Sequence, residues 1–412
     1  MEVFYDDLKS VNGEVFVVDA PCGSGKTQIA IHNIIYRDRG NKFIYITPYL
    51  NEVSRVIESC KKANIQVYEP NAKLGKGIKS NHFKQLVSKG KNIVTTHSMF
   101  DKINESCIRL LGQQGYVLYL DEVHEVVKEH SLTKKDLDLL LECGYIKIHN
   151  NGLVEWLDED YDGRFDEFKS LCDLGAMYFY GGRLFMWCFP VRVFQNMKRT
   201  YIMTYLFEGQ IQSAYYGLHN MSYTKLWVTR RDRLYYFLPH KEEYDKLFRH
   251  KIRDKINIYE GKLNYDKGIT LTSSWYQRAT DSDLQVVSLN TLNYFKNIIK
   301  GKSDDNMWTC LKVHRSKLKG KGYSKGYVEL NARATNEFKH KKNLAYLYNR
   351  YLKPTIYSFL KTKGIEFNQD LYALGDLIQW IFRSQIRDGK EINIYIPSER
   401  MRNILKEYLD KE

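Results

Sequence analysis

An apolar run at residues 15–18 leads directly into a glycine-rich turn that ends in Lys26 and Thr27. The residues that follow, from 28 to about 36, have the composition of a helix. In a strand–turn–helix unit of this kind, successive backbone N–H groups and the positive end of the helix point at one place, which favours a bound anion. The segment therefore predicts a buried strand, a phosphate-binding turn and a covering helix.

Within this turn, we expect Gly23, Ser24, Gly25, Lys26 and Thr27 to hold nucleotide phosphates. The ammonium group of Lys26 would reach the β- and γ-phosphates, and the Thr27 hydroxyl would bind Mg²⁺. Ala20 stands where the usual pattern begins with glycine. An accidental turn of the same composition is the alternative, so a second motif is needed.

A second apolar stretch, at residues 118–120, ends in the paired carboxylates Asp121 and Glu122, followed by Val123 and His124. In ATPases with a phosphate loop, an acid at the tip of a neighbouring strand holds Mg²⁺ and a following glutamate polarises the attacking water. We expect Asp121 to bind the metal and Glu122 to act as the general base. Two solvated acids at a strand end are the alternative.

Together, the two motifs resemble those of superfamily 2 helicases and translocases of the DEAD/DEAH kind. The resemblance implies two RecA-like domains that use ATP and Mg²⁺, with nucleic acid lying across both. It also implies nucleic-acid contacts at Thr47 and Pro48 and at Thr95 and Thr96, which follow predicted strands between the two ATP motifs. A threonine at a strand end also caps or turns the chain in proteins of many other kinds.

Two later segments fit the same resemblance less closely. Thr204 lies where the family couples hydrolysis to nucleic-acid binding, but Tyr205 lacks the expected small side chain, so a plain buried strand is the alternative. The segment 330–336 fits a motif that contacts nucleic acid and the ATP cleft, which makes Arg333 and Thr335 candidates.

Near the C-terminus, Gln379, Arg383 and Arg387 resemble the arginine-finger helix of the family. Gln379 would touch the γ-phosphate or water, and the arginines would neutralise charge that develops in the transition state. Phe382 replaces the family's glycine and the second arginine comes one residue late. On one continuous helix, residues 379, 383 and 387 would still share a face. A surface helix with an amphipathic stripe is the alternative.

Composition agrees with a polyanionic partner. The formal net charge is +14 and the chain has 32 tyrosines, so cations could meet phosphates and rings could stack on bases. A low-GC genome would enrich the same residue types. Seven cysteines without paired spacing indicate reduced thiols, and we expect neither a signal peptide nor a membrane span, hence a cytoplasmic protein of a prokaryotic or phage-infected cell.

The order of motifs predicts the α/β class, with two RecA-like parallel-sheet domains. We expect a first domain at 1–222, with an insert at about 128–192, and a second domain at 223–412. In the insert, the sequence predicts a helix at 134–143 and a hairpin at 145–156 with an Asn-Gly turn, and the aromatic run 177–187 favours a core over base stacking. A strand is expected at 268–275. The cation-rich stretch 312–325 is interpreted either as a flexible phosphate-binding loop or as a solvated loop.

The interpretation that follows is an ATP-dependent helicase or translocase, similar to replication proteins of phages and mobile elements. DNA is favoured over RNA, with a role in replication or recombination beside other replication proteins. The alternative is a nucleotide-gated module that binds or remodels nucleic acid without separating strands. A terminase-like motor is disfavoured, because the C-terminal half has no acidic nuclease cluster.

Overall fold

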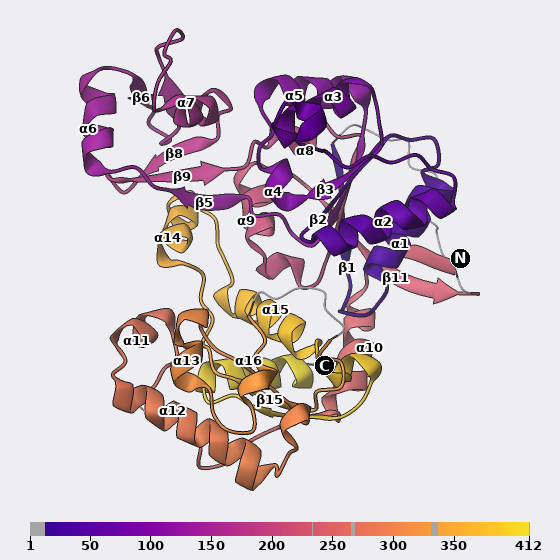
Figure 1. Ribbon diagram of the computed structural model, residues 1–412, viewed down its shortest axis with the longest axis vertical. Coiled ribbons are helices and arrows are strands. Elements are labelled where there is room, and N and C mark those ends of the chain that lie inside the picture. Colours follow the sequence, from indigo (N-terminus) through magenta and orange to yellow (C-terminus); the bar gives the residue numbers. More distant parts are fainter. Residues whose placement is uncertain (1–12, 233, 265–267, 331–336, 412) are drawn as a thin grey trace. The chain divides into compact units, whose positions relative to one another are not determined.

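The computed structural model describes residues 13–232, 234–264, 268–330 and 337–411. The chain divides into two compact units. The first unit comprises residues 1–20, 24–240 and 353–367, and the second comprises 21–23, 241–352 and 368–412. Each unit is built around its own sheet with helices packed on it (Figure 1).

The main sheet of the first unit has the order β12-β11-β1-β10-β4-β2-β3. Its strands are parallel apart from β12, which runs antiparallel to β11. In chain order the strands are β1 (Glu14–Asp19), β2 (Phe43–Thr47), β3 (Ile93–Thr96), β4 (Val117–Asp121), β10 (Arg199–Thr204), β11 (Thr224–Arg231) and β12 (Leu234–Pro239).

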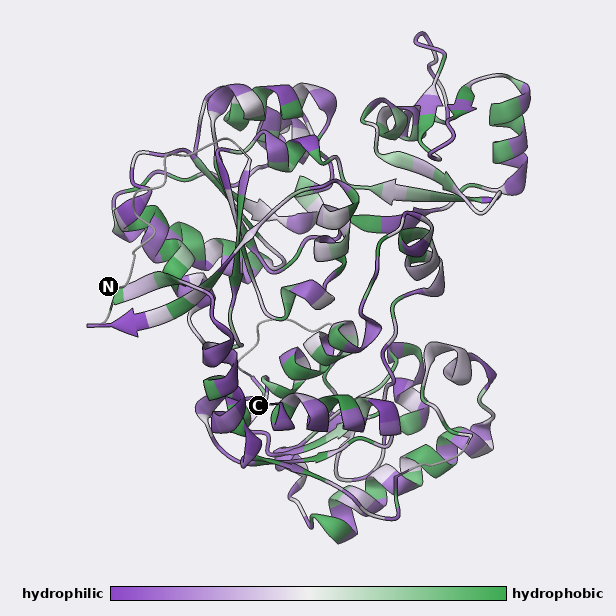
Figure 2. Cartoon of the chain, turned by 180° about the vertical axis from the view of Figure 1, so that it is seen from behind, coloured by the Kyte–Doolittle hydropathy of each residue, from purple (hydrophilic) through white to green (hydrophobic). Residues whose placement is uncertain are grey.

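Helices flank this sheet and bury one apolar side each, with hydrophilic residues on the other (Figure 2). They are α1 (Lys26–His32), a π-helical turn (Asn33–Arg37), α2 (Leu50–Lys62), α3 (Lys79–Ser88), α4 (His97–Phe100), α5 (Glu105–Gln114), α8 (Arg192–Gln195) and α9 (Ile211–Leu218). Strands of a parallel sheet are covered on both faces, which explains why the central strands have apolar residues at nearly every position.

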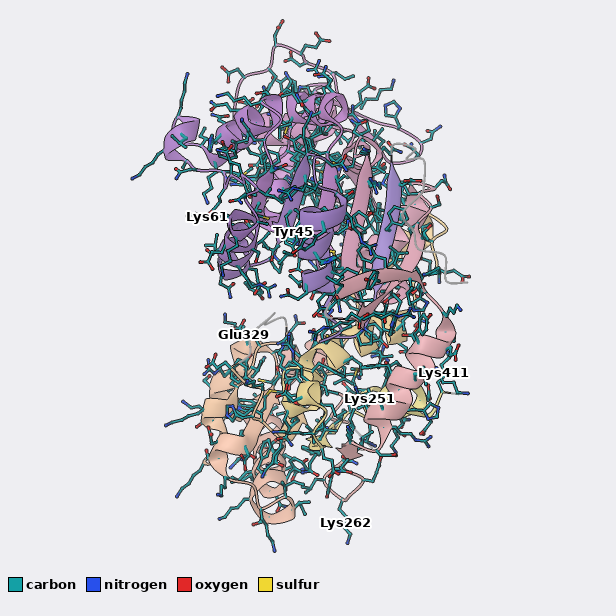
Figure 3. All side chains as sticks on the ribbon, turned by 90° about the vertical axis from the view of Figure 1, so that its right-hand side faces the viewer. Tyr45, Lys61, Lys251, Lys262, Glu329 and Lys411 are labelled. Atoms are coloured by element: carbon teal, nitrogen blue, oxygen red, sulfur yellow. The ribbon has the colours of Figure 1, made fainter. Side chains whose placement is uncertain are left out.

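A row of stacked aromatic rings crosses the sheet. Tyr119 lies 6.3 Å from Tyr45 and 5.1 Å from Tyr201 between ring centroids, and Tyr201 lies 5.5 Å from Phe237. Tyr45 is fully buried inside the first unit (Figure 3). The rings on β2, β4 and β10 pack across neighbouring strands of the sheet. Parallel pairing places the carboxyl ends of β1, β10 and β4 at one edge of this sheet.

Residues 127–188 form a separate small part of the first unit, here called the middle segment. Its strands β5 (Val127–His130), β8 (Met177–Tyr180) and β9 (Leu184–Cys188) pair antiparallel in the order β5-β9-β8. The segment also contains a helix α6 (Lys134–Glu142), a hairpin of β6 (Ile146–Ile148) and β7 (Val154–Trp156), and a helix α7 (Asp166–Asp173). The predicted helix and hairpin are confirmed, and Phe185 and Trp187 are buried in a core.

The second unit contains a parallel sheet of the order β13-β16-β15-β14. Its strands are β13 (Ile256–Ile258), β14 (Asn306–Thr309), β15 (Asn343–Tyr346) and β16 (Ile392–Tyr395). Its helices are α10 (Glu242–Arg253), α11 (Ser273–Arg278), α12 (Asp281–Asn293), α13 (Arg315–Leu318), α15 (Gln369–Ile381) and α16 (Glu399–Asp410). The prediction of an α/β protein with two parallel-sheet domains is confirmed.

Two features of the division into units differ from the expectations. The second unit starts at residue 241 instead of 223, because β11 pairs with β1 of the first sheet and β12 pairs with β11. Residues 353–367 also return to the first unit, where they form α14 (Pro354–Thr362).

The other differences concern local structure in the second unit. Residues 269–272 form no strand; instead Thr272 caps α11, its hydroxyl accepting a 3.1 Å hydrogen bond from the Trp275 N–H. The cation-rich stretch 312–325 is folded into short helical turns anchored by the buried Tyr323, and is not an open loop. Lys262 extends outward from this unit (Figure 3). Within the described ranges, no helix has the length and apolar character needed to cross a membrane.

Candidate nucleotide-binding site

The phosphate loop has the backbone that its glycines predict. Gly23 and Gly25 have φ values of 84° and 94°, in the region that favours glycine. α1 begins directly after Gly25, whose carbonyl accepts a 2.9 Å hydrogen bond from the N–H of Ile29. Lys26 donates a 2.5 Å hydrogen bond from Nζ to the Ala20 carbonyl, so its ammonium group lies back across the loop.

The loop also offers a hydrogen-bonding group that the protein itself leaves unused. Ser24 Oγ is buried and has no hydrogen-bond partner within the part of the chain that the structure describes. A buried hydroxyl without a partner costs free energy unless something else bonds to it. Together with the positive φ at Gly23 and Gly25, this fits the bound phosphates of a nucleotide.

A side chain from β12 packs directly on this loop. A Cβ atom at Gly25 would lie 2.5 Å from Cε1 of Tyr235, so any other residue at this position would require the ring to shift. The guanidinium of Arg230 lies 5.7 Å from the centroid of the same ring. Sequence patterns could not predict this contact, because Tyr235 is far from the loop in the chain.

Thr27 and Asp121 come together as the two motifs predict. Thr27 Oγ1 lies 3.2 Å from Oδ1 and 3.4 Å from Oδ2 of Asp121. Burial, followed by the charges of Glu122 and Glu52, raises the pKa of Asp121 to about 7, against the opposing hydrogen bond from Thr27. A divalent cation would compensate this buried charge directly, and a hydroxyl with one carboxylate is the oxygen ligand pair that Mg²⁺ takes beside nucleotide phosphates.

Glu122 has a backbone conformation that is costly for its residue type. Its φ is 75°, in the left-handed region, and its N–H donates a 3.0 Å hydrogen bond to the Met203 carbonyl. Such a conformation costs on the order of 1–3 kcal/mol and persists where the surroundings enforce it. The chain turns sharply here, directly after the metal-binding position, and this turn sets the direction in which the Glu122 side chain leaves the backbone.

Asp19, at the end of β1, was not identified from the sequence. Its Oδ1 accepts a 2.7 Å hydrogen bond from the Leu206 N–H, and Lys225 Nζ lies 3.3 Å from Oδ2. The carboxylate therefore holds the chain after β10 against the start of the phosphate loop. Thr204 ends β10 as a buried strand residue, and its hydroxyl has no hydrogen-bond partner among the described residues.

His124, the last residue of the second motif, lies in a polar network. Its Nδ1 is 3.3 Å from Nδ1 of His97, and its Nε2 is 3.0 Å from Oδ1 of Asp101 in a bent contact. His97 Nε2 is in turn 3.2 Å from the backbone carbonyl of Asp121. The two imidazoles therefore connect the metal-binding end of β4 with α4, which begins directly after Thr96.

A carbonyl and a carboxylate stand at the two ends of this network, and both accept hydrogen bonds only. Burial would raise the pKa of Asp101, but its contact with His124 and the charges of His124 and Lys128 lower it overall.

The threonines proposed for nucleic-acid contact lie at adjacent strand ends. Thr47 of β2 and Thr96 of β3 are register partners. The Thr47 and Thr95 side chains are buried, whereas Pro48 and Thr96 are half-buried and Thr96 Oγ1 lies 3.1 Å from Ser98 Oγ. Thr96 and the backbone at these ends are therefore more accessible than the Thr47 and Thr95 hydroxyls. The candidates Arg333 and Thr335 lie outside the described residues.

The expectation of one continuous helix through residues 379–387 is wrong. α15 carries Gln379 but ends at Ile381, with Phe382 as its cap and Ser384 in extended conformation. Arg383 is buried and donates a 3.0 Å hydrogen bond from Nη1 to the Glu329 carbonyl, whereas Arg387 is exposed on a 3₁₀ turn (Gln385–Asp388). Gln379 and the two arginines therefore do not share one helical face.

A known relative covers nearly the whole chain. The SPbeta prophage-derived uncharacterized protein YonV of Bacillus subtilis (strain 168) is 39% identical over 410 residues, 97% of this chain and 99% of the relative. The chain belongs to the YonV family.

Three family descriptions match successive parts of this YonV-family chain. The DEAD/DEAH box helicase family matches residues 5–145, the YonV middle domain residues 127–187, and the YonV C-terminal Rossmann-like domain residues 250–409. The resemblance to superfamily 2 helicases is thereby confirmed, in a chain whose relative is prophage-derived.

The structure of RecG bound to a three-way DNA junction aligns with 97% of this chain at 11% identity and a TM-score of 0.37. The chain spans 42% of that RecG chain.

Proposed function

We propose that this YonV-family chain is an ATP-dependent helicase or translocase that acts on nucleic acid, with DNA favoured over RNA. The observation that carries the proposal is the contact between Thr27 and Asp121, beside a phosphate loop with an unused Ser24 hydroxyl. Nothing in an ordinary strand–turn–helix requires a buried carboxylate and a hydroxyl to converge at the start of the helix.

In this proposal each residue of the phosphate loop and of the second motif's carboxylate pair has a defined role. Gly23, Ser24 and Gly25 supply N–H groups and a hydroxyl to the phosphates, and Lys26 neutralises their charge. Thr27 and Asp121 hold Mg²⁺, which stabilises developing negative charge when bound. Glu122 orients the attacking water and accepts a proton from it.

The second unit supplies the remaining charge in the proposal. Gln379 contacts the γ-phosphate or water, and Arg387 or Arg383 stabilises the transition state. The exposure of Arg387 favours it over the buried Arg383, whose guanidinium is engaged with a backbone carbonyl. If hydrolysis requires both units, nucleic acid held by both would be moved once per turnover.

The nucleic-acid contacts belong to the same proposal. Pro48 and Thr96, together with the backbone at Thr47 and Thr95, would bind the phosphates of one strand, as would Arg333 and Thr335 in the second unit. The net charge of +14 supports a polyanionic partner. A cytoplasmic role in phage replication or recombination, beside replication proteins, is proposed on the basis of the prophage-derived relative.

The deciding experiment measures ATP hydrolysis with single- and double-stranded DNA and RNA. We expect Mg²⁺-dependent hydrolysis that at least one DNA form stimulates several-fold, and no hydrolysis by Lys26→Ala. Hydrolysis by Lys26→Ala at the parental rate would refute the assignment of the loop. Stimulation by RNA alone would refute the preference for DNA.

A second candidate is a nucleotide-gated module that binds nucleic acid without separating strands. The observation that favours it is the end of α15 at Ile381, which removes the expected arrangement of Arg383 and Arg387 on one helix. Stimulated hydrolysis without displacement of a strand from a tailed duplex would support this candidate.

A further inference from the structure

β5 begins shortly after the second motif and carries contacts on both of its faces. Lys128 Nζ lies 3.6 Å from Oδ2 of Asp101, the carboxylate that also pairs with His124, and 4.2 Å from the ring centroid of Trp187. The next residue, Glu129, points to the opposite face because successive strand side chains alternate.

Glu129 binds the start of α14 on that opposite face. Its carboxylate contacts the ammonium of Lys353 and accepts a hydrogen bond from the Thr355 hydroxyl. Burial would raise the pKa of Glu129, but these two contacts lower it overall. A negative charge is also favourable at the N-terminal end of a helix.

The rest of α14 is held by apolar and cationic contacts to the middle segment. The ring of the fully buried Phe359 lies 6.0 Å from that of Tyr178 and 5.7 Å from that of Tyr180. Lys363 Nζ lies 5.0 Å from the Tyr178 ring centroid and contacts the Asn151 carbonyl. α14 and β5 therefore form one packed assembly within the first unit (Figure 1).

In the chain, α14 lies between two stretches that belong to the second unit. Residues 353–367 belong to the first unit, whereas the residues before and after them, 241–352 and 368–412, belong to the second. The backbone therefore joins α14 to residues of the second unit at both of its ends. The middle segment contacts this helix through β5, Tyr178 and Tyr180.

We propose that Lys128 and Glu129 are positioning residues that couple the metal-binding end of β4 to α14, through His124 and Asp101 on one face of β5 and through Lys353 and Thr355 on the other. The inference rests on the proposed function. In this role the middle segment reports the nucleotide state of the Asp121–Glu122 turn to the connecting helix. A passive anchor would hold α14 equally in all nucleotide states.

The test follows backbone hydrogen exchange in α14 with and without a slowly hydrolysed ATP analogue and Mg²⁺. We expect the analogue to change exchange at residues 354–362 at least threefold in the parental protein. In Lys128→Met and in Glu129→Gln this change should disappear, with affinity for the analogue within twofold of the parent. The double variant should lose no more of the α14 exchange response than either single variant, because both residues belong to the same pathway of contacts.

Glu155→Gln is the matched control, since Glu155 is in the same middle segment but pairs with His149 at 2.9 Å within the hairpin. It should leave the α14 response unchanged. Nucleic-acid stimulation of hydrolysis should fall several-fold in Lys128→Met and Glu129→Gln, with basal hydrolysis unchanged.

Three outcomes would overturn the coupling. If the analogue protects the phosphate loop but does not change exchange in α14, the coupling is refuted and the proposed function stays intact. If α14 exchanges faster in Glu129→Gln to the same extent with and without the analogue, Glu129 only anchors the helix. Strictly additive effects of the two variants would place them in separate links. Failure to bind the analogue at the phosphate loop would instead refute the proposed function.

Discussion

Thr27 Oγ1 lies 3.2 Å from Oδ1 of Asp121, although β10 separates the strands that carry the two motifs. In a parallel sheet the carboxyl ends of all strands meet at one edge, so the two motifs can share a metal without being adjacent strands. This geometry leads to the first prediction.

Thr27→Val keeps the shape of the side chain and removes its oxygen. We expect the Mg²⁺ concentration for half-maximal hydrolysis to rise at least tenfold, because one metal ligand is lost, which corresponds to roughly 1.4 kcal/mol. A Mg²⁺ titration of hydrolysis measures the shift. Ser54→Ala, which removes an exposed hydroxyl from α2, should leave the titration unchanged.

Glu122 tests whether backbone strain accompanies catalysis. Glu122→Gly should abolish hydrolysis yet raise the free energy of unfolding by about 1 kcal/mol, because glycine adopts the 75° φ without strain. Urea unfolding and hydrolysis rates measure the two effects. Glu122→Gln keeps the backbone strain and loses the charge. This variant should also be inactive, but its free energy of unfolding should rise much less than that of Glu122→Gly. Equal stability of the two variants would argue against strain.

Gly25→Ala tests the contact with Tyr235. The added Cβ would lie 2.5 Å from the ring, so we expect loss of nucleotide binding and a destabilisation well above the cost of φ alone. Gly77→Ala is the matched control, since Gly77 has a φ of 88° and nothing within 4 Å of its Cβ position. It should cost about 1–2 kcal/mol. Tyr235→Ala should rescue part of the stability of Gly25→Ala.

The lowered pKa of Asp101 predicts a pH dependence of stability. A depressed folded-state pKa stabilises the protein above the unfolded pKa near 3.8, and the stabilisation is lost as the pH falls through the folded value. Asp101→Asn should therefore cost about 2 kcal/mol at pH 7 and clearly less at pH 3. Denaturant unfolding at both pH values measures this. Asp138→Asn, at an exposed position of α6, should show no such difference.

Arg383 and Arg387 should separate stability from catalysis. Arg383→Ala should lower the free energy of unfolding by about 2 kcal/mol, because the Glu329 carbonyl loses a charged donor. Arg387→Ala should leave stability within about 0.5 kcal/mol and slow hydrolysis at least ~100-fold. If Arg387→Ala hydrolyses ATP as fast as the parent, Arg383 would be the better candidate for the arginine that stabilises the transition state.

The sequence was sufficient for the features that local patterns determine. The strand–turn–helix at Lys26, the strand ending at Asp121, and the Asn-Gly hairpin of the middle segment each follow from residues that are adjacent in the chain. Gly25 adopts the positive φ that its place in the loop requires.

The features that the sequence did not reveal depend on contacts between distant segments. Asp19 and Asp101 are ordinary acids until the fold places Leu206 and His124 beside them. The second domain boundary was misplaced because the β11–β12 hairpin has the same pattern whichever sheet it joins. The end of α15 at Ile381 depends on the turn at Ser384, which follows an otherwise helical pattern.

The return of residues 353–367 to the first unit has a consequence for biosynthesis. Phe359 and Leu360 are fully buried there, yet they leave the ribosome only after residues 241–352 of the second unit. Domains otherwise fold in order from the N-terminus during synthesis. Here the aromatic surface around Tyr178 has to wait, uncovered, until most of the second unit has been translated.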